Sequence, residues 1–224
     1  MIIRRSSEIV IVLLILLIIF PFWLLISVTI KINSPGSIFY KSKRVGKNGK
    51  NFNLFKFRTM HLSKSNTSLI TSKKDNRIFL FGRLLRNSKI DETPQLLNIL
   101  LGDMSFAGPR PEDPYFVNKY YLPIHEKTLT IRPGLYSTGT IYYYTHLEDS
   151  IDEFNPEKKY IEEILPIKLA LDIYYINHKS LIYDIRLTTR TILAIFNKIF
   201  GLKLLNAPKE LNLSNKYVHP MKYK

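Results

Sequence analysis

The 224-residue chain contains no cysteine, which excludes disulfide bonds and thiolate metal sites and is consistent with a cytoplasmic position. Its five histidines are scattered without an i, i+4 pair, so the sequence offers no histidine-based metal site either. The nine glycines form neither a P-loop nor a Gly-x-Gly-x-x-Gly motif. The common nucleotide-binding folds therefore have no support here, and any nucleotide would have to be held by arginines, a metal ion and loops.

Acidic residues are also few: 18 Asp and Glu stand against 33 Lys and Arg, for a net charge of +15. Such a balance suits nucleic acid, an anionic membrane face or phosphate-rich substrates. No helix-turn-helix, zinc-finger or RNA-binding motif is present, so we expect no nucleic-acid partner. The mean hydropathy of -0.04 includes a very apolar N-terminus, and the rest of the chain is therefore polar enough for a largely soluble domain.

The N-terminal segment has almost no polar residues. Residues 9–30 are apolar apart from Ser27 and Thr29, and about 22 such residues can cross a bilayer. The run is too long for a secretory signal peptide, and no small-x-small cleavage site follows it. Lys and Arg flank both ends, and these residues prefer the cytoplasmic side. Pro21 breaks the helix near its midpoint, which favours a hairpin that enters and leaves one leaflet; an ordinary span is the alternative.

After this segment about 190 residues remain, enough for one domain with its own core. Residues 181–200 form a basic amphipathic pattern, which is typical of a helix on a membrane surface but fits core packing equally well. The other expected elements are strands at 37–40 and 52–57 around a turn with two glycines, a loop at 61–75, helices at 78–87, 115–128 (interrupted at Pro123) and 158–177 (broken at Pro166), a strand-like stretch at 141–144, and a loosely ordered tail after 207.

Asp91 and Glu92 are the most informative residues in the chain. They lie where a helix is expected to begin, because Pro94 suits a first helical turn and apolar residues follow. Free N–H groups at that terminus favour negative charge, so we expect both carboxylates to be ionised. Such a pair alone more often has only a capping role. Here, however, Arg110 follows closely between two prolines, and a carboxylate pair beside a fixed arginine suits phosphoryl transfer with a divalent metal.

Further cations in the sequence could bind phosphate. Lys56 and Arg58 lie two apart in an expected strand and would share one face. They predict either a phosphate clamp or a solvated basic strand. Arg86 lies five residues before Asp91 and is either a substrate-phosphate ligand or a surface arginine.

These motifs occur together in an order that resembles the bacterial sugar transferases of the monotopic phosphoglycosyl transferase superfamily, in their small single-domain form. The resemblance covers roughly residues 4–200. It rests on the Arg5-to-Glu8 start, the helix broken at Pro21, Pro35-Gly36-Ser37-Ile38-Phe39, Phe55-Lys56-Phe57-Arg58-Thr59-Met60, Arg86, Asp91-Glu92-Thr93-Pro94-Gln95-Leu96, the run Gly102-Asp103-Met104-Ser105-Phe106-Ala107-Gly108-Pro109-Arg110-Pro111, Arg132-Pro133-Gly134 and Leu171-Asp172-Ile173-Tyr174-Tyr175.

The resemblance implies an enzyme that moves a phosphosugar from a UDP-sugar to polyprenyl phosphate and releases UMP. By this resemblance Asp91 is the nucleophile and a ligand of Mg²⁺, and Glu92 assists at the metal or handles protons. The implied substrate-binding residues are Lys56, Arg58, Arg86, Pro109, Arg110 and Pro111. A non-catalytic, membrane-anchored basic binding protein is the alternative, and the sequence leaves homo-oligomer formation and the identity of the sugar open.

The resemblance also implies an architecture. We expect a mostly helical α+β chain: a re-entrant membrane helix-break-helix at residues 1–31, a catalytic domain with short strands and interfacial amphipathic helices at 32–206, and a polar tail at 207–224. The catalytic domain would face the cytoplasm at the bacterial inner membrane. Two departures from the family pattern are Phe20 before the helix break, where the family commonly has serine, and residues 135–139 after the Arg-Pro-Gly turn.

Overall fold

The computed structural model describes all residues except 1, 62–69, 71–74, 151–154, 203–204 and 222–224. A long N-terminal helix, α1 (Ile2–Asn33), precedes a largely helical domain that contains two small two-stranded sheets. The expected mostly helical α+β class is therefore confirmed. The loop expected at 61–75 falls largely outside the described residues.

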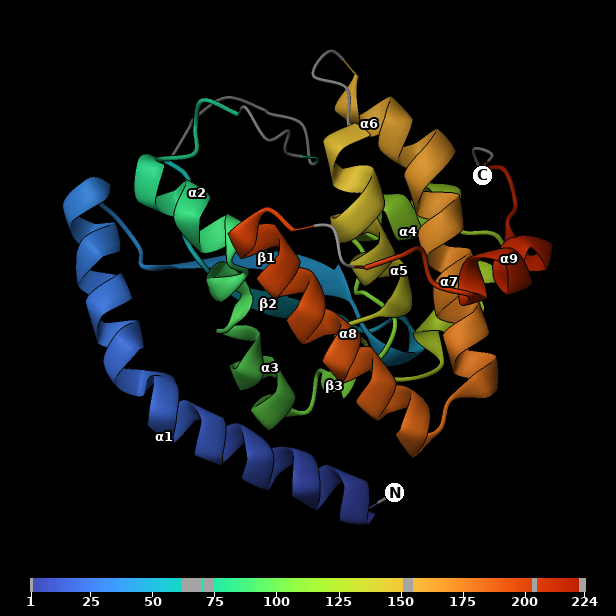
Figure 1. Cartoon of the computed structure of the whole chain (residues 1–224), viewed down its shortest axis with the longest axis horizontal. Helices are drawn as coiled ribbons and strands as arrows, with labels where there is room; N and C mark the ends of the chain where they lie inside the picture. Colours follow the sequence, from blue (N-terminus) through green and yellow to red (C-terminus); the bar gives the residue numbers. More distant parts are fainter. Residues whose placement is uncertain (1, 62–69, 71–74, 151–154, 203–204, 222–224) are drawn as a thin grey trace.

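Helix α1 is continuous but bends near its middle, and the rest of the chain lies on the inner side of the bend (Figure 1). Pro21 lies inside the helix and has no N–H to donate to the carbonyl four residues earlier, which accounts for the bend. The expected break is thus a bend within one helix. By length and composition, Arg5–Asn33 is apolar enough to cross a membrane, and an 18-residue stretch within it has a mean hydropathy of 3.4.

Only the inner face of α1 is packed. Val12 and Ile30 are fully buried against the domain, whereas Leu17 is 76% exposed and Leu25 is 67% exposed. An apolar surface of this length on the outer face calls for an apolar environment around it. The inner face contacts two clusters of buried residues, one containing Leu54, Leu96, Ile99 and Met104 and the other Phe57, Phe79 and Leu85.

The predicted hairpin is present. Strand β1 (Phe39–Val45) pairs antiparallel with β2 (Asn51–Phe57), and Phe39 lies opposite Phe57. The first strand is longer than expected and begins two residues later. A second sheet joins β3 (Ser105–Ala107) and β4 (Gly134–Tyr136) in parallel. Sequence patterns missed this sheet because strands of three residues leave no readable alternation.

The strand-like stretch predicted at 141–144 is wrong, because these residues are helical. Helix α5 (Thr138–Tyr142) runs into a π-helical turn at Tyr143–Leu147. The side chain of Ser137 caps α5 by accepting the N–H of Thr140 at 2.9 Å. This N-cap signal outweighs the strand preference of the tyrosines that follow.

Most of the remaining helices follow the predicted pattern, namely α2 (Leu80–Asn87), α3 (Gln95–Leu101), α4 (Pro114–Tyr120), α6 (Pro156–Lys159), α7 (Leu165–His178) and α8 (Leu181–Phe200). A further helix, α9 (Glu210–Ser214), lies in the tail, where the sequence predicts none. Instead of a break at Pro166, a π-helical turn at Tyr160–Ile164 joins α6 to α7 and accommodates the proline at the start of α7. Helix α9 packs against α7, with Ser214 buried, so this part of the tail is more ordered than predicted.

Candidate active site

The two carboxylates lie in a short turn that precedes α3. Asp91 and Glu92 belong to a 3-10 turn at Ile90–Glu92, and α3 begins only at Gln95. The sequence-based expectation that the pair starts the helix is therefore wrong by one turn. Pro94 occupies the N-cap position of α3.

Asp91 and Glu92 have different surroundings. Glu92 accepts a hydrogen bond from Lys56 Nζ at 2.9 Å, and its other oxygen lies 2.8 Å from Arg110 Nη2. Burial acts to raise the pKa of Glu92, but Arg110 and Lys56 outweigh it and hold this pKa well below the ordinary range. For Asp91, burial raises the pKa despite the charge of Lys56. The surroundings of the pair therefore act in opposite directions, lowering the pKa of Glu92 and raising that of Asp91.

One carboxylate oxygen of Asp91 is available for contact with a ligand. Its Oδ1 atom is buried and has no hydrogen-bond partner among the residues that the structure describes. A buried carboxylate oxygen without a partner is costly unless a ligand or metal contacts it. The pair therefore divides into Glu92, which holds two cations, and Asp91, which has an oxygen available for chemistry.

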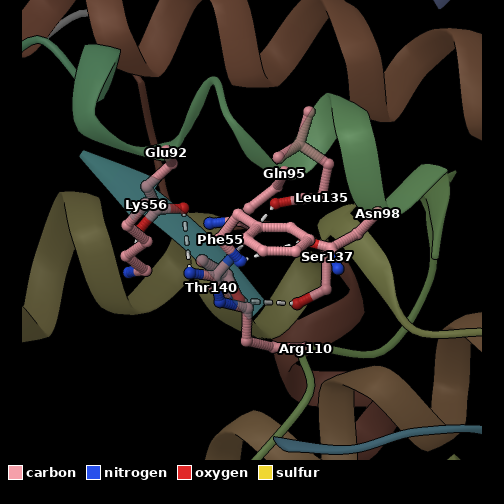
Figure 2. A network of polar contacts seen from close by, with 9 residues as sticks. All are labelled: Phe55, Lys56, Glu92, Gln95, Asn98, Arg110, Leu135, Ser137 and Thr140. Carbon is pink, nitrogen blue, oxygen red and sulfur yellow. Dashed lines mark hydrogen bonds and ion pairs between the residues drawn. The ribbon is translucent and has the colours of Figure 1, made fainter. Parts of the chain in front are cut away.

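Arg110 is held in place from several sides (Figure 2). Besides its ion pair with Glu92, its Nη1 donates to Gln95 Oε1 at 3.3 Å and to the carbonyl of Leu135 at 3.1 Å. Its backbone N–H donates to Asp172 Oδ2 at 3.1 Å. Asp172 is buried in α7 and also accepts the N–H of Gly139 at 3.1 Å. These contacts leave Arg110 little freedom and aim its guanidinium at the carboxylate pair.

The prolines beside Arg110 stiffen the same loop. Pro109 is buried, and its carbonyl accepts the N–H of Gly134 at 2.9 Å. Gly134 and Gly108 approach so closely that a Cβ on Gly134 would lie 2.2 Å from the nitrogen of Gly108. Pro111 contributes to the wall of the cavity described next. The loop is therefore fixed by its prolines, by glycine packing and by hydrogen bonds.

A cavity of about 860 Å³ opens beside the carboxylate pair. Asp91, Glu92 and four of the predicted cations, Lys56, Arg58, Arg86 and Arg110, line it. Cationic side chains in its wall outnumber acidic ones, which favours a polyanionic ligand. The other cations that line it are Arg44, Arg77, Arg83, Lys89, Lys168 and Lys198, and the other acids are Glu112, Asp113 and Glu148.

Arg58 and Arg86 differ in how much of their guanidinium is available. Arg58 is buried and donates to the carbonyls of Pro35 at 2.7 Å and Ser34 at 2.5 Å, so it fastens the end of β2 to the segment after α1. The interpretation of a solvated basic residue is wrong for Arg58. Arg86, in contrast, has a buried Nη1 with no hydrogen-bond partner among the described residues. Arg58 Nε is also buried without a partner among the described residues, but both terminal nitrogens of Arg58 are used, whereas Arg86 keeps a terminal nitrogen for a phosphate.

Sequence reasoning missed a buried polar cluster in the cavity wall. Lys168 Nζ donates to Glu112 Oε1 at 2.7 Å and to the hydroxyl of Tyr160 at 2.6 Å, and that hydroxyl donates to the same Glu112 oxygen at 2.7 Å. Burial acts to raise the pKa of Glu112, but Lys168 and Tyr160 lower it overall. Lys168 and Asp172 lie one helical turn apart on α7, and that spacing was the signal available in the sequence.

Helix α1 is connected directly to the carboxylate turn. Trp23, two residues after Pro21, donates from Nε1 to Thr93 Oγ1 at 3.0 Å. Its ring also packs edge-on against Phe57 of β2 at 5.5 Å between ring centroids. Because Thr93 follows Glu92 in the chain, the bend of α1 and the site are coupled through one hydrogen bond.

The site fits a magnesium ion only if a substrate supplies part of its coordination. Among the described residues, no group of three or more His, Asp or Glu side chains could hold a metal. Mg²⁺ in phosphate chemistry is commonly bound by one or two carboxylates, with substrate phosphates and water as the other ligands. The partnerless oxygen of Asp91 meets this requirement.

Comparisons with known proteins match this chain to sugar transferases. The family model described as "Bacterial sugar transferase" matches residues 1–198. A UDP-glucose:undecaprenyl-phosphate glucose-1-phosphate transferase of Caulobacter vibrioides is 31% identical over 84% of this chain and 68% of its own length. The exopolysaccharide production protein PSS of Rhizobium leguminosarum is 32% identical over 87% of this chain and 95% of its own length.

Some relatives are considerably longer. A UDP-N-acetylgalactosamine-undecaprenyl-phosphate N-acetylgalactosaminephosphotransferase of Aeromonas hydrophila is 31% identical over 86% of this chain, but the match spans only 43% of the relative. The family match, residues 1–198, contains the apolar helix, the carboxylate pair and the Pro-Arg-Pro loop of this chain. The chain belongs to the bacterial sugar transferase family.

Proposed function

We propose that this protein transfers a phosphosugar from a UDP-sugar to undecaprenyl phosphate, giving undecaprenyl diphosphosugar and UMP, as the first membrane step of a surface glycan pathway. The observation that carries the proposal is the unequal carboxylate pair. Glu92 holds Lys56 and Arg110 beside a cationic cavity, while Asp91 keeps a buried oxygen without a partner. The names of the relatives, which include UDP-sugar and undecaprenyl-phosphate transferases, support the choice of substrates.

The reaction proceeds in two displacements. In the first, a carboxylate oxygen of Asp91 attacks the phosphorus that bears the sugar, the bond from that phosphorus to the bridging oxygen breaks, and UMP leaves with the electron pair. In the second, an oxygen of the lipid phosphate attacks the same phosphorus and displaces Asp91, which regains its carboxylate. Two easier steps thus replace one direct transfer between two anions.

The cations supply the stabilisation that these displacements need. Lys56 and Arg110 are held by Glu92 within reach of the carboxylate pair, where charge develops on the phosphoryl oxygens. Arg86 offers its partnerless Nη1 to a further phosphate oxygen. Asp91 would hold Mg²⁺ with the help of the substrate diphosphate, and the ion would neutralise part of the diphosphate's negative charge.

The membrane position follows from α1 and α8. We propose that α1 enters and leaves the cytoplasmic leaflet of the inner membrane, with its exposed outer face in lipid. On α8, Ile192 is 63% exposed, Phe196 47% and Phe200 61%, and basic residues flank this apolar face, as in helices that lie at a membrane interface. The site then stands where a soluble nucleotide sugar and a membrane-bound acceptor meet.

The test uses detergent-solubilised protein with a panel of UDP-sugars and undecaprenyl phosphate. We expect UMP release with at least one donor, and intact-protein mass spectrometry with that donor alone should detect the phosphosugar adduct. Asp91→Asn should keep the fold and abolish both signals. Asp103→Asn, which changes a carboxylate outside the cavity wall, is the matched control and should retain both. Full turnover by Asp91→Asn would exclude the aspartyl intermediate.

A further inference from the structure

Lys89 has an unusual backbone conformation immediately before the carboxylate turn. Its φ of 59° and ψ of 13° lie in the left-handed region, which glycine adopts without steric cost and lysine does not. Among the described residues, Asn48 is the other non-glycine residue with a positive φ. The backbone at position 89 therefore favours glycine, and the presence of lysine points to a contribution from its side chain.

A buried tyrosine holds that side chain in place. Lys89 Nζ lies 4.4 Å from the centroid of the Tyr144 ring, within the range of a cation–π contact. Tyr144 is only 5% exposed, and its hydroxyl donates to the carbonyl of Asn87 at 2.7 Å. The ring thus joins the end of α2 and the Lys89 side chain beside the carboxylate pair. A second ammonium, Lys198 Nζ, lies 5.0 Å from the same centroid and pairs with Glu148 at 2.7 Å.

Lys89 differs from Lys56 and Arg110 in having no ion pair within the described part of the chain. Lys56 and Arg110 are both ion-paired with Glu92. Lys89 lines the same cavity and forms no ion pair with a carboxylate among the described residues. Its positive charge acts on both Asp91 and Glu92. An ammonium group in this position can bind a second phosphate group that approaches the carboxylate pair.

The position of Lys89 indicates which phosphate it meets. It follows α2, whose Leu80 is 81% exposed and whose Leu84 is 60% exposed, and α2 packs beside α1. Lys56 and Arg110 approach the pair from β2 and the Pro-Arg-Pro loop instead. An amphiphile that keeps its hydrocarbon along the apolar surfaces of α1 and α2 would therefore bring its head group to the cavity on the Lys89 side.

We propose that Lys89 is a binding residue for the phosphate head group of the lipid acceptor, a phosphate monoester on a long hydrocarbon, and that Tyr144 positions its ammonium. The proposal rests on the proposed function for the identity of that amphiphile. Its test is equilibrium binding of undecaprenyl phosphate to detergent-solubilised protein without any donor, so it does not depend on turnover.

The variant Lys89→Gly distinguishes the contribution of the side chain from that of the backbone conformation. The substitution removes the ammonium and suits the left-handed conformation, so the protein should unfold at a temperature no lower than the wild type. We expect the Kd for undecaprenyl phosphate to rise about tenfold or more. The Kd for undecaprenol, which lacks the phosphate, should be the same in both proteins. Lys89→Arg, which keeps the charge, should retain most of the affinity for the phosphorylated lipid.

Two matched controls isolate the effect. Asn48→Gly introduces glycine at the other described non-glycine position with a positive φ, which lies outside the cavity wall. Lys47→Gln removes one exposed positive charge that also lies outside the cavity wall. Neither variant should change the Kd for undecaprenyl phosphate.

An unchanged Kd for undecaprenyl phosphate in Lys89→Gly, or an equal loss of undecaprenol binding, would overturn the assignment. If inorganic phosphate protects the Lys89 amine from acylation as well as the lipid does, the site is not an acceptor site. Absence of UMP release by the wild type would instead count against the proposed function. It would not affect the measured binding of undecaprenyl phosphate at Lys89.

Discussion

Arg110 and Glu92 form an ion pair of 2.8 Å that joins the Pro-Arg-Pro loop to the carboxylate turn. The pair explains why two adjacent carboxylates differ. Arg110 and Lys56 hold the pKa of Glu92 well below its usual range, whereas burial raises the pKa of Asp91. Glu92 therefore fixes the cations, and Asp91 faces the cavity with an oxygen that has no partner among the described residues.

The first prediction concerns the planar guanidinium group of Arg110. Its two terminal nitrogens contact Glu92, Gln95 and the carbonyl of Leu135, and a lysine ammonium cannot make these contacts in the same plane. We expect Arg110→Lys to lower kcat/KM for the donor by about 10-fold to 100-fold, with the fold intact. Initial rates of UMP release at varied donor concentration measure the effect.

The matched control is Arg132→Lys, because Arg132 is exposed and does not line the cavity. This variant should behave as the wild type does in the same assay. Donor kinetics that are unchanged in Arg110→Lys would remove Arg110 from the donor site and leave it a purely structural role.

The second prediction concerns magnesium. Because the described residues provide no cluster of three metal ligands, an ion at Asp91 would be shared with the substrate diphosphate. We expect excess EDTA to abolish UMP release and added Mg²⁺ to restore it. The thermal unfolding midpoint of the protein alone should be the same with and without EDTA, since no closed protein site holds the ion. Undiminished turnover in EDTA would contradict the metal requirement.

The sequence was a good guide where chemistry depends on local motifs. The sequence predicts the hairpin, α8 and the candidate residues Asp91, Glu92, Lys56, Arg58, Arg86 and Arg110, and the structure brings these six side chains to one cavity. Their roles remain predictions.

The errors came from contacts that are distant in sequence or from competing local signals. The Ser137 cap turned an expected strand into α5. Arg58 lines the cavity, as predicted, but the sequence does not indicate that its guanidinium also contacts the carbonyls of Ser34 and Pro35, more than twenty residues away. The Lys168–Glu112 pair likewise joins residues 56 positions apart. The spacing of Lys168 and Asp172 places both on one face of α7, but no periodic pattern identifies Glu112 as the partner of Lys168, because that contact depends on how α7 packs against the loop that contains Glu112.

The third prediction concerns Asp172. Burial raises the pKa of its carboxyl group to about 6, although the N–H groups of Arg110 and Gly139 act to lower this pKa. A group with a raised folded-state pKa stabilises the protein below its unfolded pKa, and this contribution is lost as the pH rises through the folded pKa. The free energy of unfolding of the wild type relative to Asp172→Asn should therefore fall by about 2 kcal/mol between pH 4 and pH 7. Urea denaturation in detergent at four pH values measures this difference.

Ile173→Val is the matched control for Asp172. It removes one buried methyl group from the neighbouring position of α7 and adds or removes no titratable group. The difference between the wild type and this variant should stay constant across the same pH range, at about 1 kcal/mol. A constant difference for Asp172→Asn as well would show that the buried carboxyl does not titrate in this window.

The last prediction concerns the topology of α1. Positive charge flanks both ends of its apolar segment, and the helix bends at Pro21, so we expect both ends on the cytoplasmic side. The chain has no native cysteine, and single cysteines at Ser6 and Lys47 can therefore be labelled without background. Both positions are exposed, whereas Ser42 in β1 is buried and unsuitable. Ser6→Cys and Lys47→Cys should both resist an impermeant thiol reagent outside intact cells and react after lysis. Labelling of Ser6→Cys alone from outside would show an ordinary span, which would overturn the re-entrant topology but leave the chemistry of the site unaffected.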